Sequence, residues 1–196
     1  AEARRRALEI MERVRITDPE RRFDMYPFEL SGGMRQRIVI AAALVLRPAL
    51  LIADEPTTAL DVTVQAEVLR TFRAVVEHTG TSLVLVTHDL GVVAGTCDEV
   101  AVMYAGRIVE RADAATLFRA PAHPYTRALL DCRPRLDDAP AERLRSIEGQ
   151  PPSPALDPPG CAFAPRCPRA SQVCKITPPP LVPAGDGAFA CHHPLE

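Results

Sequence analysis

The chain has 196 residues and a formal net charge of −2, so it is long enough to bury a core. With this net charge, the chain as a whole lacks the excess of basic residues expected of a protein that binds nucleic acid or anionic lipid. No apolar run approaches the ~18 residues that a membrane span needs, so we expect any membrane association to go through a partner.

The first predicted element is an amphipathic helix. Residues 3–14 alternate charged and apolar side chains at helical spacing, and Asp18-Pro19 ends the pattern. Its arginines are best explained as a solvated face. The chain begins with Ala and no apolar signal core follows, so we expect it to begin partway through a longer protein.

A second predicted helix spans 34–46 and ends before Pro48. Ser31 is a natural N-cap for this helix, and Gly32 and Gly33 follow it. A Ser hydroxyl and bare Gly amides at a helix N-terminus suit an anion, because the free N–H groups and the helix dipole both point there. Taken alone, Ser-Gly-Gly is better explained as a flexible loop.

A buried strand is predicted next. The apolar run 50–53 leads into the adjacent acids Asp54 and Glu55, and Pro56 prevents the strand from continuing. The carboxyl edge of a parallel sheet is where open α/β folds bind ligands. Alternation along a strand predicts that the two acids point to opposite sides. One acid could then hold Mg²⁺ while the other orients or deprotonates a water; the alternative is a strand that ends in a solvated turn.

A helix and a second buried strand follow the two acids. Asp61 is positioned to cap a helix over 62–78, and the strand 82–86 ends shortly before His88. This places His88 at the same sheet edge as the acids. A lone His after a strand is more often structural, but three such endings at one edge favour a site.

In this order, Leu30-Ser31-Gly32-Gly33, Asp54-Glu55, Ala59-Leu60-Asp61 and His88 resemble the second half of the nucleotide-binding domain of ATP-binding-cassette (ABC) transporters. The resemblance implies an α/β fold: the C-terminal part of a P-loop NTPase (ABC ATPase) domain with a parallel sheet core, followed by a small irregular Cys-rich tail. It also implies ATP and Mg²⁺ as ligands.

The resemblance further assigns roles to individual residues. Ser31, Gly32 and Gly33 match the signature motif, which touches the γ-phosphate held by an opposing subunit, and Asp61 matches the D-loop. The next signature position usually holds Gln and here holds Met34.

The remaining motif residues are expected to act on the chain's own nucleotide. Asp54 matches the Walker B acid that works through Mg²⁺, and Glu55 matches the residue that polarises the attacking water. His88 matches the switch histidine that senses the γ-phosphate.

Beyond His88 we expect a short helix over 90–96 and a hairpin with strands 100–104 and 107–111. The later stretch Pro121-Ala122-His123-Pro124-Tyr125-Thr126 resembles the ABC ATPases of dipeptide and oligopeptide importers. From the residues alone, His123 is predicted to be a surface residue in a turn with no role in a site.

The tail is rich in proline and cysteine and begins with a stiff connector over 149–154. Four of the six cysteines lie in it, Cys161, Cys167, Cys174 and Cys191, whereas Cys97 and Cys132 are interpreted as packing residues.

Four thiolates suit tetrahedral Zn²⁺ or an iron–sulfur cluster, and their wide spacing favours a cluster. Two disulfides are the weaker explanation, since no secretory signal is present. The tail resembles the C-terminal module of the peptide-importer ATPases, some of which carry a [4Fe-4S] cluster. His192 and His193 could also act as ligands but are expected to be exposed.

A P-loop is missing from the sequence. The only lysine, Lys175, follows Cys174, and no Gly-Lys pair exists, so the Gly-x-x-x-x-Gly-Lys-Ser/Thr loop is expected upstream of Ala1 or in another chain. We therefore predict that these 196 residues alone neither bind ATP tightly nor hydrolyse it.

Four segments are expected. Residues 1–48 would form part of the helical signature subdomain, 49–119 the second half of the ATPase core, 120–148 a helical extension, and 149–196 a Pro/Cys-rich metal- or cluster-binding module.

The favoured function is the energy-coupling ATPase subunit of a di-/oligopeptide importer. The alternatives are an ABC-type ATPase acting on nucleic acid and a metal- or cluster-binding interaction module without ATPase activity. The favoured function implies a second ABC ATPase domain and transmembrane permease subunits as partners, an extracytoplasmic peptide-binding protein as an indirect partner, and no nucleic acid. It places the chain at the cytoplasmic face of the cell membrane.

Overall fold

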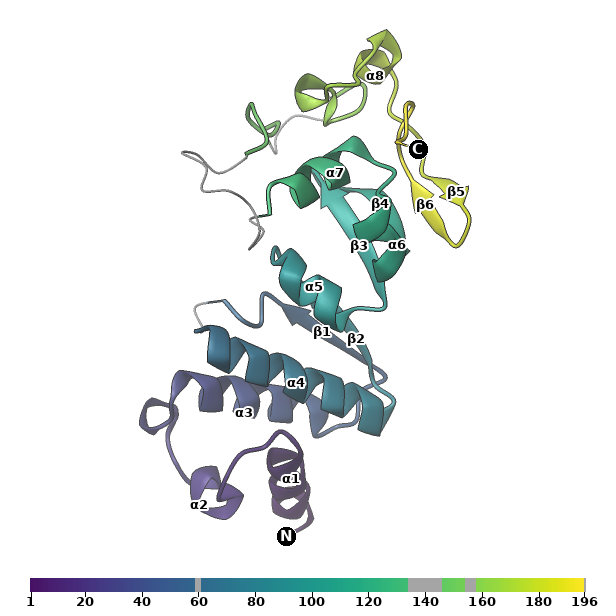
Figure 1. Ribbon diagram of the computed structural model, residues 1–196. Coiled ribbons are helices and arrows are strands. Elements are labelled where there is room, and N and C mark those ends of the chain that lie inside the picture. Colours follow the sequence, from purple (N-terminus) through teal and green to yellow (C-terminus); the bar gives the residue numbers. More distant parts are fainter. Residues whose placement is uncertain (59–60, 134–145, 154–157, 196) are drawn as a thin grey trace. The chain divides into compact units, whose positions relative to one another are not determined.

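The computed structural model describes residues 1–58, 61–133, 146–153 and 158–195 (Figure 1). The chain forms two compact units, Ala1–Val92 and Val93–Glu196. Some sequence predictions fall outside the described residues: Ala59 and Leu60 of the D-loop, positions 134–145 of the helical extension, and Pro154 of the connector. The four predicted segments stay a proposal.

Unit 1 is mostly helical. Its helices are α1 (Glu2–Arg13), α2 (Pro19–Phe23), the short 3-10 helix η1 (Pro27–Glu29), α3 (Gly32–Leu44) and α4 (Val62–Thr79), and the start of α5 (Leu90–Thr96) completes it. The apolar face of α1 is buried in a core that also receives side chains from α3 and α4. Val14 and Val68 are fully buried in this core, whereas the arginines of α1 face solvent.

The sheet of unit 1 has two parallel strands, β1 (Leu50–Asp54) and β2 (Ser82–Val86), with Asp54 opposite Val86. One face packs on the helices through Leu51 and Ala53, while Leu50 and Ile52 are 50% and 65% exposed on the other. The prediction of a strand buried on both faces is therefore wrong for this chain by itself, although parallel sheets are normally covered on both faces.

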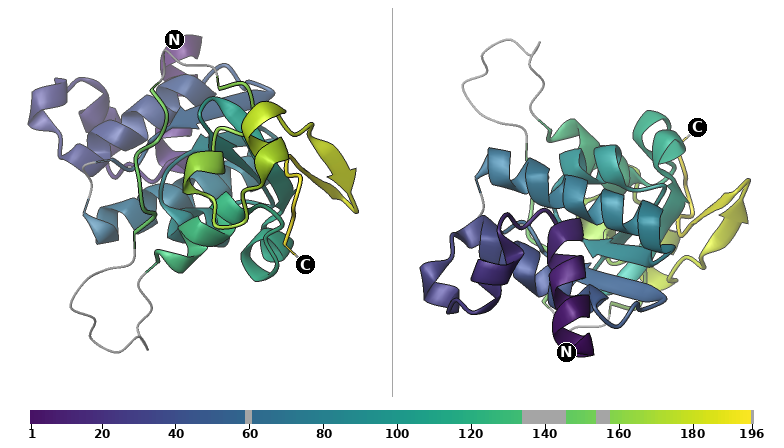
Figure 2. Two further views of the ribbon diagram at one scale, coloured as in Figure 1. Left: turned by 90° about the horizontal axis from the view of Figure 1, so that it is seen from above. Right: turned by 90° about the horizontal axis from the view of Figure 1, so that it is seen from below.

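Unit 2 is built around an antiparallel sheet with the strand order β3-β4-β6-β5. Its elements after α5 are β3 (Glu99–Tyr104), β4 (Arg107–Asp113), α6 (Ala114–Arg119), α7 (Pro124–Asp131), η2 (Ala164–Arg166), α8 (Gln172–Ile176), β5 (Val182–Ala184) and β6 (Gly187–Phe189). The β5–β6 hairpin extends from the rest of the unit (Figure 2). Because β6 pairs with β4, the tail adds two strands to the predicted hairpin.

The core of unit 2 contains a cluster of three aromatic rings beside its aliphatic side chains. Phe163 is 1% exposed, and its ring lies 5.3 Å from that of Tyr104 and 5.2 Å from that of Tyr125. Arg166 donates one hydrogen bond to the Tyr104 hydroxyl and two to the carbonyls of residues 147 and 148. The tail thus packs into the unit through Phe163 and Arg166.

The local predictions agree closely with the structure. The strand over 82–86 has the predicted bounds, and the helix over 62–78 extends by one residue. The irregular tail is not confirmed, because residues 182–189 form a hairpin that the sequence analysis missed. Within the described part of the chain, every helix is too short or too polar to cross a membrane.

Candidate functional site

The first candidate site lies at the carboxyl edge of the β1–β2 sheet. The strand β1 ends at Asp54, and Glu55 adopts a left-handed conformation with φ of 46°. Its N–H still donates to the carbonyl of Val86 at 2.9 Å, which holds Glu55 against the end of β2. The prediction that the two acids alternate along one strand is therefore wrong, because Asp54 is the last residue of β1 and the backbone turns at Glu55. A left-handed non-Gly residue is strained and is held there by its surroundings.

Glu55 and His88 are in direct contact, as the shared sheet edge predicted. His88 Nδ1–H donates to Glu55 Oε1 at 2.7 Å, and Thr58 Oγ1–H donates to Glu55 Oε2 at 3.1 Å. The His88 side chain is 83% exposed, so the pair faces open space. Both carboxylate oxygens of Glu55 are therefore held in place while the site stays accessible.

The contact shifts the pKa values of Glu55 and His88 in opposite directions. The hydrogen bond from His88 lowers the pKa of Glu55, and the bond from Thr58 adds to this. The hydrogen bond to Glu55 and its negative charge raise the pKa of His88. An ionised Glu55 can accept a proton, which is what the activation of a water requires.

Asp89 supports the site and was missed by the sequence analysis. Its Oδ1 accepts from the N–H groups of Gly91 and Val92 at the start of α5, and its Oδ2 accepts from Gln65 of α4. This anchors the loop that carries His88. The signal for it was an Asp directly before a predicted helix, a typical N-cap position.

The signature residues and Asp61 lie at two neighbouring helix N-termini. Ser31 Oγ accepts from Met34 N at 3.4 Å, and Asp61 Oδ1 accepts from Val64 N at 2.9 Å. The two helices approach so closely that a Cβ on Gly33 would lie 2.7 Å from Val64 Cγ1. Gly33 is therefore required by helix packing, in addition to the phosphate approach that its place in the motif suggests.

The structure thus brings the predicted residues together in two groups. Glu55 and His88 are in contact, with Asp54 exposed beside them at the end of β1. Ser31, Gly32, Gly33 and Asp61 occupy the adjoining ends of α3 and α4.

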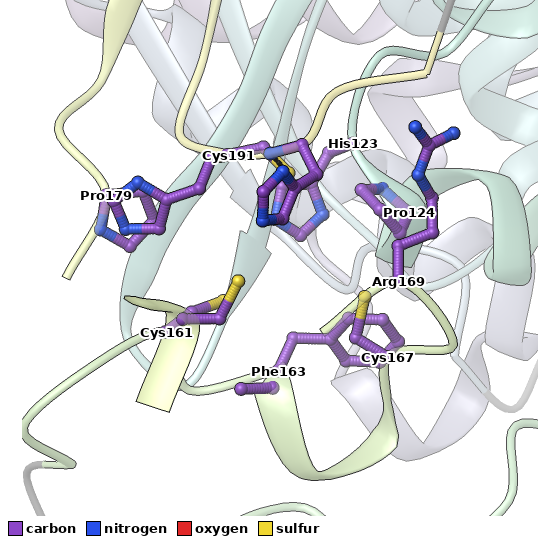
Figure 3. A pocket seen from close by; sticks show the side chains of 12 residues that line it. His123, Pro124, Cys161, Phe163, Cys167, Arg169, Pro179 and Cys191 are labelled. Atoms are coloured by element: carbon purple, nitrogen blue, oxygen red, sulfur yellow. Dashed lines mark hydrogen bonds between the residues drawn. The ribbon is translucent and has the colours of Figure 1, made fainter. Parts of the chain in front are cut away.

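The second candidate site is a pocket within unit 2 that all four tail cysteines line (Figure 3). Cys161 and Cys167 approach it from one side, and Cys191 and His123 from the other. Cys174 lies in α8, and its carbonyl accepts from the N–H of Cys161 at 2.7 Å. Each cysteine comes from a separate turn or element, as their wide spacing predicted.

A glycine permits the approach of two of these segments. A Cβ on Gly160 would lie 2.3 Å from the Cys174 carbonyl oxygen. Any side chain at this position would push Cys161 away from α8. Gly160 therefore has a direct role in assembling the pocket, because it lets Cys161 lie against α8.

Backbone N–H groups approach the sulfurs. Ser171 N–H donates to Cys174 Sγ at 3.5 Å, and His193 N–H donates to Cys191 Sγ at 3.4 Å. Burial raises the pKa of Cys191, and the neighbouring sulfurs raise it further, while the His193 amide opposes the shift.

The pKa values of Cys161 and Cys167 are shifted in the same direction as that of Cys191. Burial raises the pKa of Cys161, opposed by the amides of Phe163 and Ala164, and burial raises the pKa of Cys167, opposed by the amide of Arg169. Such donors favour the thiolate, which is the form that binds metals.

No described cysteine forms a disulfide, so the paired-disulfide alternative is wrong for the structure as it stands. Among residues 1–58, 61–133, 146–153 and 158–195, no group of three or more His, Cys, Asp or Glu side chains is arranged to hold one metal ion.

The prediction that His123 is a surface residue is wrong. It is 1% exposed, lines the cysteine pocket, and burial lowers its pKa to about 4. Its Nδ1 accepts from the N–H of Tyr125 at 3.0 Å, which makes it the N-cap of α7. The turn preference of His-Pro was interpreted correctly, but burial depends on β4 and the tail, which are distant in sequence.

Comparison with known proteins gives two family matches. Residues 2–58 match the family model described as ABC transporter, and residues 109–174 match that of the oligopeptide/dipeptide transporter C-terminal region. An oligopeptide transport ATP-binding protein, OppD of Salmonella typhimurium, is 48% identical over 196 residues. By these matches the chain is similar to ABC transporter ATP-binding proteins.

A second relative and a solved structure are also described as parts of ABC transporters. A probable peptide ABC transporter ATP-binding protein of Sinorhizobium fredii, y4tR, is 54% identical over 97% of this chain and 57% of its own length. The solved structure of cbiO1 from Clostridium perfringens, part of the ABC transporter complex cbiONQ, matches with a TM-score of 0.54 and 31% identity. This match covers 59% of this chain and 45% of that chain. The α/β ABC ATPase fold with a parallel sheet is confirmed.

The ABC relatives are longer than this chain. All of this chain aligns with the Salmonella protein, but it spans 58% of that protein's length. The family model for ABC transporters ends at Thr58, directly after the sheet-edge acids.

Proposed function

We propose that this chain is the second half of the energy-coupling ATPase subunit of a di- or oligopeptide importer. The observation that carries the proposal is the 2.7 Å contact between Glu55 and His88 at the carboxyl edge of two parallel strands. The relatives described as oligopeptide and dipeptide transport ATP-binding proteins support the choice of substrate class.

In this proposal Glu55 is the catalytic base. An ionised Glu55, fixed through both oxygens by His88 and Thr58, would orient a water and accept its proton as the water attacks the γ-phosphorus of ATP. ADP leaves with the electron pair of the broken P–O bond, and the γ-phosphoryl group becomes inorganic phosphate. His88 would hold Glu55 and contact the γ-phosphate.

Asp54 would hold Mg²⁺, since it offers an exposed carboxylate at the same edge and hard cations prefer oxygen ligands. Bound Mg²⁺ would neutralise phosphate charge. A P-loop must come from residues outside these 196, because no Gly-Lys pair occurs in them.

Ser31, Gly32, Gly33 and Asp61 would act toward a second ATPase domain. They lie at the adjoining N-termini of two helices of 13 and 18 residues, where free N–H groups favour a phosphate. The proposed assembly joins two such domains to permease subunits at the cytoplasmic face of the membrane, with a peptide-binding protein as an indirect partner. Nothing in the sequence or the relatives favours nucleic acid.

The test uses the assembled transporter that contains this chain. Glu55→Gln keeps the size and one acceptor oxygen of the side chain but removes the base, so ATP turnover should fall by about 10²–10⁴-fold. Glu77→Gln, on the exposed face of α4, is the matched control and should retain activity. Equal turnover in the two variants would remove Glu55 from the proposed role.

We further propose that Cys161, Cys167, Cys174 and Cys191 hold a [4Fe-4S] cluster. Free thiols from four separate segments line one pocket, and backbone amides approach their sulfurs. A cluster is larger than one ion, which suits four cysteines that come from separate segments of the chain. Bound there, the cluster would supply a cross-link between these segments.

Anaerobic purification followed by absorption spectroscopy and metal analysis tests the cluster. We expect a broad band toward the blue end of the visible range and about four irons per chain. Zinc without iron would replace the cluster by the Zn²⁺ alternative.

A further inference from the structure

One polar group in the cysteine pocket has no assigned role. His123 is 1% exposed, and its Nε2 has no hydrogen-bond partner among the described residues. The carbonyl of Ala190 is near enough to favour the charged ring, but it does not complete a hydrogen bond with Nε2. A buried donor without a partner is unfavourable, so its presence in the pocket points to a ligand or another function.

The hydrogen bond at the other ring nitrogen fixes the position of the proton. Nδ1 accepts from the backbone N–H of Tyr125 at 3.0 Å and therefore carries no hydrogen. In the neutral ring the proton is then on Nε2. His123 thus presents an N–H donor to the pocket.

The backbone holds this ring rigidly. Glu110 of β4 is 3% exposed, and its carboxylate accepts from the N–H groups of Ala122 and His123 at 2.6 and 2.9 Å. Pro124 fixes the first residue of α7. The orientation of His123 is therefore set before any ligand binds.

The two other imidazoles of the pocket have partners at Nε2. His192 Nε2–H donates to the Thr177 carbonyl at 2.9 Å, and His193 Nε2 is hydrogen-bonded to Ser171 Oγ at 2.7 Å. Among the three imidazoles described in the pocket, His123 alone has an uncommitted Nε2.

We propose that His123 Nε2–H donates a hydrogen bond to a sulfur of the iron–sulfur cluster held by the four cysteines, and so belongs to that binding site. This inference rests on the cluster proposed above. Sulfide and thiolate sulfurs are acceptors that gain negative charge on reduction, so a fixed donor stabilises the reduced cluster.

Two substitutions separate the role of Nδ1 as the N-cap of α7 from the role of Nε2–H as a hydrogen-bond donor. In His123→Asn the short amide can still cap α7 in place of Nδ1, but it does not reach the position of Nε2. In His123→Gln the longer amide places an N–H group near that position but is a poorer cap.

The two variants are compared by the midpoint potential of the cluster in the intact chain. A dye-mediated titration with dithionite measures this potential. His123→Asn should disfavour the reduced state about tenfold, a fall of about 59 mV for a one-electron couple. His123→Gln should retain most of the wild-type value. An unchanged potential in His123→Asn, or equal shifts in both variants, would overturn the inference.

The wild-type chain allows a direct reading that does not depend on variant folding. In the reduced protein labelled with ¹⁵N-histidine, electron–nuclear double resonance should show one ¹⁵N coupling and one exchangeable proton near the cluster. An absent coupling, with Nε2–H bonded to Ala190 instead, contradicts the inference while leaving the cluster in place. A wild-type chain that contains no iron rejects the cluster itself, and the contact with it.

Discussion

The two candidate sites differ in how much of each the chain supplies. At the sheet edge, Glu55 and His88 form a contact that faces open space, and an apolar face of the sheet lies uncovered beside it. In the cysteine pocket, the four proposed ligands, the amides that donate to their sulfurs and a buried imidazole all come from unit 2. In our proposal, a catalytic edge that needs residues outside this chain thus shares one polypeptide with a cluster-binding pocket whose lining residues all lie in unit 2.

The sharpest test of this contrast uses the 196 residues alone. They should bind iron and sulfide anaerobically yet show no ATP turnover, because the four proposed cluster ligands lie in unit 2, whereas the proposed nucleotide site has no Gly-Lys pair to complete it. Metal analysis and a malachite-green phosphate assay on the same sample measure both. Mg²⁺-dependent turnover abolished by Glu55→Gln would break the contrast.

Removing the centre of the unit 2 core should have the next largest effect. Phe163 is 1% exposed and packs against Tyr104 and Tyr125, so Phe163→Ala should lower the free energy of unfolding by about 3–5 kcal/mol. Chemical denaturation followed by circular dichroism measures this. Exposed Val173→Ala in α8 is the control and should change stability little. Similar losses in both variants would show that Phe163 is not the centre of this core.

A smaller effect is expected at the start of α4. Asp61→Ala removes the side-chain acceptor for Val64 N–H and should destabilise unit 1 by about 1 kcal/mol. Asp61→Asn keeps an acceptor and should restore most of the loss in the same denaturation experiment. A full-size loss in the Asn variant would indicate that charge, rather than the cap, matters there.

The smallest effect concerns the titration of His88. Contact with Glu55 raises the pKa of His88 and lowers that of Glu55, so the charged pair exists between these two pKa values. Its contribution to stability is lost as pH rises through the His88 pKa and as it falls through the Glu55 pKa. In Glu55→Gln the pKa of His88, followed by NMR, should fall toward its ordinary value. An unchanged titration would mean that the pair does not form in solution.

Sequence reasoning succeeded where the signal is local. Ser31 and Asp61 are N-caps with recognisable neighbours, and the strands over 50–54 and 82–86 are short apolar runs with clear ends. The contact of His88 with Glu55 followed from one further rule, that the carboxyl ends of parallel strands share an edge.

It failed where the outcome depends on partners distant in sequence. His123 looks like a turn residue, and its burial depends on Glu110 of β4 and on Phe163 of the tail. The available signal was Glu110 in the middle of a predicted strand, because a carboxylate that becomes buried needs donors nearby. The hairpin over 182–189 was missed because its strands have three residues each.

The pairing of β6 with β4 has a practical consequence for any attempt to remove the tail. Truncation before Val182 would leave β4 with free backbone N–H and C=O groups along one side. Such an open strand invites pairing with another copy, so the shortened chain should aggregate. Replacing the cysteines one at a time by serine leaves this edge protected and gives the cleaner way to ask what the pocket does.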